Sequence, residues 1–126
     1  MAIYKLKTFA RFARSEDISD ESLAAAIERA ARGLVDADLG GGLIKQRVAR
    51  QGQGRSGGYR MIVIYRLKER AVFLYGFAKS DRENIEDDQL QTMRETAAEF
   101  LAHDDAALDA AVSLGKIQEI NHDQET

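Results

Sequence analysis

Lysine and arginine are the residues whose number and spacing could do chemistry in this chain, and they gather in one stretch. Residues 40–82 hold ten of them against two acids, Glu69 and Asp81. The remaining residues carry eight bases and nineteen acids, so a basic stretch lies inside a chain of net charge −3. Local clusters of one sign bind polyanions whatever the overall charge is. The stretch therefore indicates a surface that binds phosphate groups.

Other kinds of chemistry have few candidate residues. The chain has no cysteine, which excludes disulfides, thiolate metal sites and a cysteine nucleophile. His103 and His122 are the only histidines, and their spacing fits no common helical metal-binding pair. We expect both to be exposed residues of a helix or of the tail. No metal and no cofactor is predicted.

Length and hydropathy place the chain among soluble single-domain proteins. Its 126 residues, 44% of them apolar, are enough for one core. No apolar run approaches the ~20 residues that span a bilayer. Basic residues interrupt the N-terminus where a secretory signal would need an apolar region, so we expect a cytoplasmic protein that contacts no membrane.

Three predicted strands carry the basic residues. In residues 43–50, apolar and basic side chains alternate, so that Ile44 and Val48 lie on one face and Lys45 and Arg47 on the other. Residues 59–67 and 71–78 are rich in Ile, Val, Tyr and Phe. Residues 62–64 are consecutive apolar residues, so the second strand is predicted to be central and covered on both faces. The glycines at 40–42 are interpreted as a flexible connector into the first strand.

Strand alternation tests whether the basic residues converge. If residues 51–58 close a hairpin about their centre, Arg47 lies opposite Ile62; if residues 68–69 close the next one, Arg60 lies opposite Phe77. Directly opposed residues point to the same face, although a slip of one residue would break the arrangement. The residues predicted to share one face are Lys45, Arg47, Arg60 and Lys79.

Two interpretations of this face are open. The basic residues could be solvated charges on an open sheet face, which is common in antiparallel sheets. Against this, no acid is interleaved on the three strands, and a loop with four glycines brings backbone N–H groups and Arg55 to the same edge. Tyr59, Tyr65 and Tyr75 could stack on bases, or they could be core or edge residues.

Helices are predicted on both sides of the strands in the sequence. Residues 3–7 form a strand or lead straight into a helix over 8–14. Ser19 is the predicted N-cap of a helix that Gly33 ends. Its apolar stripe comprises Leu23, Ile27, Ala30 and Leu34.

Two further helices follow the strands. Asp87 or Asp88 is predicted to cap a helix, and a shorter helix begins at Asp104 and ends at Gly115. The stripe of the first comprises Leu90, Met93, Ala97 and Leu101, and the anchors of the second are Leu108 and Val112. Residues 116–120 could add a short segment, and residues 121–126 form a polar tail.

Three segments together resemble a known family. GGLIKQRVAR, GQGRSGGYR and FLYGFAKSDRENI are similar to toxins of type II toxin–antitoxin pairs in the RelE/ParE/HigB superfamily, with the HigB-like RelE branch the closest. The resemblance covers residues 3–101. It implies an α+β, microbial-RNase-like fold with N-terminal helices packed on a small antiparallel sheet. We expect a toxin core at 1–102, and a C-terminal helical extension with a polar tail at 103–126.

The resemblance also implies an activity, ribosome-dependent cleavage of mRNA in the A site without a metal. Such cleavage needs a base for the 2′-hydroxyl, cations for the charge on the phosphate and an acid for the leaving oxygen. Lys45 or Lys79 could act as the base, and Arg47 and Arg60 could clamp the phosphate with bidentate geometry. The residues expected to bind RNA or phosphate around them are Arg50, Arg55, Tyr59 and Arg82.

The matched positions are Arg60 after Gly-Gly-Tyr, the pair Lys45 and Arg47, and Lys79 at the end of the last strand. Ser80 stands where RelE proper has an arginine, and Glu86 stands near the place of its catalytic tyrosine. Either Lys79 and Arg82 take over these roles or catalysis differs within this branch. The C-terminal extension could cover the core or contact an antitoxin.

Two other functions compete with RNA cleavage. A ParE-type toxin would inhibit DNA gyrase by binding and would not need a convergent basic quartet. A non-catalytic module would bind RNA or the ribosome with salt-dependent affinity and cut nothing. Either kind of toxin implies a cognate antitoxin with an acidic surface and a helix-turn-helix of its own.

Overall fold

A computed structural model of the chain describes residues 1–49, 58–78 and 85–120. The helices and strands follow one another in the order β1 (Ala2–Leu6), α1 (Lys7–Ser15), α2 (Asp20–Ala31), β2 (Ala37–Gly40), β3 (Leu43–Val48), β4 (Tyr59–Arg66), β5 (Arg70–Ala78), α3 (Asp87–Ala102), α4 (Asp105–Ser113) and β6 (Ile117–Glu119). The fold class is α+β, as the sequence predicts.

The strands form one six-stranded sheet in the order β2-β3-β4-β5-β1-β6. The predicted antiparallel strands are β3, β4 and β5, and the whole sheet is mixed because β1 runs parallel to β5, with Ile3 paired to Ala71. The remaining neighbours are antiparallel. Pairing between segments about 70 residues apart leaves no local pattern in the sequence, which is why the predicted sheet lacked β1 and β6.

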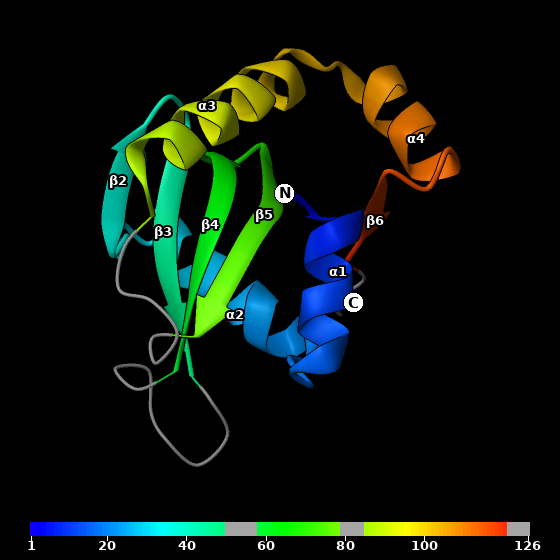
Figure 1. Cartoon of the computed structure of the whole chain (residues 1–126). Coiled ribbons are helices and arrows are strands. Elements are labelled where there is room, and N and C mark those ends of the chain that lie inside the picture. The colour runs from blue at the N-terminus through cyan, green and yellow to red at the C-terminus, as the bar shows by residue number, and fades with distance from the viewer. Residues whose placement is uncertain (50–57, 79–84, 121–126) are drawn as a thin grey trace.

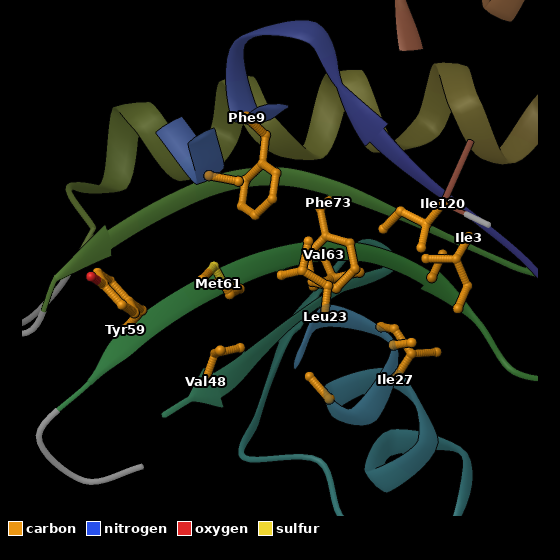
Figure 2. Packing of buried hydrophobic residues seen from close by; sticks show 14 of the residues in the cluster. Ile3, Phe9, Leu23, Ile27, Val48, Tyr59, Met61, Val63, Phe73 and Ile120 are labelled. Carbon is orange, nitrogen blue, oxygen red and sulfur yellow. The ribbon is translucent and has the colours of Figure 1, made fainter. Parts of the chain in front are cut away.

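Helices cover both faces of the sheet and create two apolar cores. One core joins α1 and α2 to the sheet through Phe9, Leu23, Val63 and Phe73 (Figure 2). The other joins α3 and α4 to the opposite face, and Phe100 and other apolar residues of the two helices pack there. Figure 1 shows α3 crossing the sheet at the end where β3 begins. The opposite end of β3 extends beyond the helix.

The central position of β4 follows from its composition. Ile62, Val63 and Ile64 are each 0% exposed, and β4 lies between β3 and β5. A strand with helices on both faces buries consecutive side chains, so a continuous apolar run replaces alternation. The prediction of a central strand is confirmed.

The predicted helix ends are largely confirmed. Ser19 caps α2 by accepting a hydrogen bond from the Ser22 N–H at 3.1 Å. Gly33 follows the end of α2 with φ +86°, a conformation that favours glycine. Asp104 caps α4 in the same way as Ser19 caps α2. In α3 the prediction of Asp87 or Asp88 as the N-cap is wrong, because the cap is Glu86, which forms a capping box with Gln89.

The glycines at 40–42 form a defined turn between β2 and β3, and the prediction of a flexible connector is wrong. All three have positive φ, between +65° and +85°. A Cβ on Gly42 would lie 2.4 Å from Leu101 Cδ1. Arg94 of α3 donates to the Leu39 carbonyl from Nη2 at 2.6 Å and from Nε at 3.2 Å. Helix α3 therefore holds this turn against the sheet.

Residues 103–120 belong to the same layered structure. Leu108 of α4 is buried, and β6 pairs with β1 so that Leu6 lies opposite Ile117. The predicted short segment at 116–120 is thus an edge strand. The division of the chain into a core at 1–102 and an extension at 103–126 stays a prediction.

Candidate nucleic-acid interface

Three of the four predicted catalytic residues lie together on one face of the sheet. Arg47 of β3 pairs directly with Arg60 of β4, and Lys45 pairs with Ile62 two residues along. Directly opposed residues, and residues two apart on a strand, point to the same face. We call Lys45, Arg47 and Arg60 the basic cluster.

The pairing of β3 with β4 differs from the predicted register by two residues. Arg47 was predicted opposite Ile62 and lies opposite Arg60. A shift of two residues keeps every side chain on its face, so the convergence survives the error. The prediction took residues 51–58 as the loop and placed the centre of the hairpin midway along them. Strand β3 ends at Val48 and β4 begins at Tyr59, so the centre lies one residue earlier and the register shifts by two. The second predicted pair, Arg60 opposite Phe77, is confirmed.

Four predicted site residues lie outside the described residues, so their positions stay predictions: Arg50, Arg55, Lys79 and Arg82. The strand ends from which their segments continue are described. Val48 pairs with Tyr59, and Tyr59 pairs with Ala78. The two segments that carry the four residues therefore join the sheet at the end where the basic cluster lies.

Tyr59 is a core residue and is removed from the predicted RNA-binding set. It is 3% exposed and lies on the face covered by α1 and α2 (Figure 2). Its hydroxyl donates to Glu16 Oε1 at 2.9 Å, and its ring meets Phe12 edge to face. Alternation along the strand would have shown this, because neighbours such as Tyr59 and Arg60 point to opposite faces.

The remaining described basic residues of the stretch lie at the other end of the same strands. Arg66 pairs with Glu69, with Nη1 3.7 Å from Oε1, in the β4–β5 turn. Arg70 is 8% exposed and donates to the carbonyl of Phe100 at 3.0 Å and to that of His103. The stretch is thus divided by the fold, and only part of it forms the basic cluster.

The strands that carry the basic cluster contribute no acidic residue of their own to match its charge. No acidic residue occurs in β3, β4 or β5. Arg47 is exposed and Lys45 half-buried, and neither forms an ion pair within the described part of the chain. Like charges directly opposite each other destabilise a sheet, and an anion bound between Arg47 and Arg60 would offset that repulsion.

Two residues that the sequence did not indicate support Arg47 from the main chain. Asp36 Oδ2 accepts a hydrogen bond from the Arg47 N–H at 2.7 Å, and Arg29 Nη2 donates to the Arg47 carbonyl. Arg29 and Asp36 also form an ion pair, with Nη2 of Arg29 4.0 Å from Oδ2 of Asp36. Because Arg29 is 18 residues before Arg47, no local pattern points to the contact.

Gln46 is a third unpredicted residue at this place. Its side chain is 0% exposed, donates to the Ala26 carbonyl at 2.9 Å and accepts from the Asp36 N–H at 2.7 Å. A buried amide with its donor and acceptor both satisfied fixes the relative positions of the groups that it joins. Gln46 therefore ties β3 to α2 and to the segment that carries Asp36.

Two tyrosines have perturbed acidity, and neither is next to the basic cluster. Burial raises the pKa of Tyr65 above its usual value, and its hydroxyl has no hydrogen-bond partner in the described structure. Burial also raises the pKa of Tyr4, and the Glu119 carboxylate raises it further. Tyr65 pairs with Ala71 beside the β4–β5 turn, and Tyr4 lies on β1.

Glu86, near the position of the catalytic tyrosine in RelE proper, has a structural role here as the cap of α3. Within residues 1–49, 58–78 and 85–120, no group of three or more His, Asp or Glu residues could hold a metal ion. None of the described helices is both long and apolar enough to cross a membrane.

Comparison with known proteins gives one match. A family model described as the RelE toxin of the RelE/RelB toxin–antitoxin system matches residues 1–120. A search of curated proteins gives no match. The family match includes α4 and β6 as well as the strands that carry the basic cluster.

Proposed function

This chain belongs to the RelE toxin family and is the toxin of a toxin–antitoxin system; from that premise, we propose that it cleaves mRNA on the ribosome without a metal ion. The observation that carries the proposal is the direct pairing of Arg47 with Arg60, with Lys45 two residues along on the same face. The HigB-like branch remains a prediction.

The basic cluster suits the charge that develops during RNA cleavage. Attack by the 2′-hydroxyl adds negative charge to the phosphate, and two guanidinium groups on neighbouring strands can bind two of its oxygens each. Because the groups project from paired strands, little reorganisation is needed when the phosphate arrives. Lys45, and Lys79 outside the described residues, are the proposed proton-transfer groups.

The cognate antitoxin is the partner that family membership implies. We propose that an acidic segment of the antitoxin covers the basic cluster, since opposite charges would neutralise it. Cleavage and antitoxin binding would then compete for Arg47 and Arg60.

Arg60→Ala tests the proposal, with Arg66→Ala as the matched control. Both arginines lie on β4, but Arg66 is at the other end and pairs with Glu69. Arg60→Ala should lower cleavage by about 10²–10³-fold, the usual cost of losing one transition-state donor. Arg66→Ala should cleave like the wild type, and both variants should keep the wild-type circular dichroism spectrum.

Induced expression in a bacterial host gives the readout, through growth and primer extension on an abundant mRNA with and without a translation inhibitor. Growth arrest with translation-dependent cuts, both lost in Arg60→Ala, supports the nuclease. Arrest with intact mRNA would favour the gyrase-inhibiting alternative. Absence of arrest with retained ribosome binding would favour a non-catalytic module.

A further inference from the structure

On the side of β3 that faces away from β4, no strand of the described residues pairs with Arg47. The last β2 residue along this direction is Ala37, which pairs with Lys45. Beyond this pair, β4 is the strand of the described residues that pairs with β3. The N–H and C=O of Arg47 would face an open edge on the β2 side, because both groups of one residue in an antiparallel strand point the same way.

Side chains take the place of the missing strand. The Arg47 N–H donates to Asp36 Oδ2 at 2.7 Å, and the Arg47 carbonyl accepts from Arg29 Nη2. Arg29 and Asp36 form an ion pair with each other, and the side-chain oxygen of Gln46 accepts a hydrogen bond from the Asp36 N–H. Both backbone groups of Arg47 are therefore bound by charged side chains from outside the sheet.

This support acts on the residue that faces Arg60. Strand β3 ends at Val48, one residue later, so Arg47 would fray at an edge bonded on one side only. An exposed arginine side chain has several rotatable bonds, and its guanidinium can be placed reliably only if its Cα is fixed. We propose that Arg29 and Asp36 are positioning residues, which hold the main chain of Arg47 so that it and Arg60 meet one phosphate together.

This inference rests on the proposed function, and Asp36→Ala separates it from a simple effect of charge. Removing a carboxylate beside cationic residues would strengthen polyanion binding if Asp36 acted through its charge alone. If Asp36 instead positions Arg47, removing it should weaken catalysis. Asp36→Ala should lower the single-turnover rate of ribosome-dependent mRNA cleavage by about tenfold, as expected for a small misplacement of a binding group. Ribosome affinity should stay equal to or above that of the wild type.

Two variants serve as matched controls. Asp36→Asn keeps an oxygen that can accept from the Arg47 N–H, so it should restore most of the activity. Asp38→Ala removes the same charge from the same segment, but Asp38 Oδ1 accepts from the Gly40 N–H in the turn at the far end of β3. Asp38→Ala should therefore cleave at least as fast as the wild type.

A double variant asks whether Asp36 acts through Arg47. Adding Asp36→Ala to Arg47→Ala should cause no further loss, whereas independent effects would add. The inference is overturned if Asp36→Ala cleaves as fast as the wild type, or if the two losses add in the double variant.

Hydrogen exchange at the Arg47 amide measures directly whether Asp36 holds this main chain, and the measurement does not depend on catalytic activity. The amide should be protected in the wild type and exchange faster in Asp36→Ala, and unchanged exchange would overturn the inference. If the wild type and Arg47→Ala cleave equally or not at all, the proposed function fails; the exchange result then still decides whether Asp36 holds this main chain.

Discussion

The two ends of the β3–β4–β5 sheet contain the same kinds of basic residue with different partners. At the end with the turns, Arg70 donates to the carbonyls of Phe100 and His103, and Arg94 donates to that of Leu39. At the other end, the side chains of Arg47 and Lys45 form no ion pair within the described part of the chain. Figure 1 shows that α3 lies over the end with the turns and does not cover the other end.

The difference teaches that charge count does not assign a role to a basic residue. A guanidinium has five donors and no acceptor, so a helix end with free carbonyls can bind it completely. Nη1 of Arg70 donates to two such carbonyls at the C-terminus of α3. The same residue type becomes a candidate phosphate ligand where its guanidinium pairs with no carboxylate of the described residues, as at Arg47.

The largest expected effect comes from breaking the sheet that both ends share. Ile64→Asp should lower the free energy of unfolding by more than about 4 kcal/mol, because it buries an unpaired carboxylate at a site that is 0% exposed. Chemical denaturation measures this, with Tyr65→Phe beside it as a neighbour that should fold normally. A soluble Ile64→Asp protein that melts like the wild type would show that β4 is not central.

Arg70→Met tests the end with the turns. It should cost about 2–4 kcal/mol of stability, because two carbonyls at the end of α3 lose a charged donor in a buried place. Cleavage per folded molecule should stay unchanged, which is the reverse of Arg60→Ala. Lys68→Met, in the exposed turn nearby, is the control and should change stability by less than about 0.5 kcal/mol. Lost cleavage with unchanged stability would contradict the comparison.

Gly42→Ala probes how tightly α3 is seated on the β2–β3 turn. The new Cβ would lie 2.4 Å from Leu101 Cδ1 at a φ of +85°, so we expect a loss of about 2 kcal/mol in thermal unfolding. Gly33→Ala is the control, with φ +86° but no atom within 4 Å of the Cβ, and should lose only about 1 kcal/mol. Equal losses would mean that the contact with Leu101 yields freely.

The smallest effect concerns Tyr65. Burial raises the pKa of Tyr65 in the folded state above the unfolded value of 10.0. The protonated hydroxyl therefore contributes to the free energy of unfolding below pH 10, and this contribution is lost as the pH rises through the folded-state pKa. Tyr65→Phe removes a hydroxyl without a described partner, so it should melt at or above the wild-type temperature and lose less stability between pH 10 and 11. Melting curves at pH 7 and pH 10.5 check this; a lower melting temperature at pH 7 would show that the hydroxyl has a partner.

Much of the local structure could be predicted from the sequence. The caps at Ser19 and Asp104, the stop at Gly33 and the central position of residues 62–64 depend on residues close together in the chain. The predicted convergence of Lys45, Arg47 and Arg60 also came from the sequence, since it depends only on the parity of strand positions. Parity survives a shift of two residues, which is why an incorrect register still gave the correct face.

The rest depended on contacts between distant segments. Strand β1 joins β5 across about 70 residues, and Arg29 reaches Arg47 across 18. No periodic pattern encodes such contacts, because they arise only when separate elements are packed. The sequence by itself determined the elements and the face on which the basic cluster lies. The tertiary structure decided which arginine side chains are bound to carbonyls of the fold, because only packing brings carbonyls and carboxylates within reach of a guanidinium.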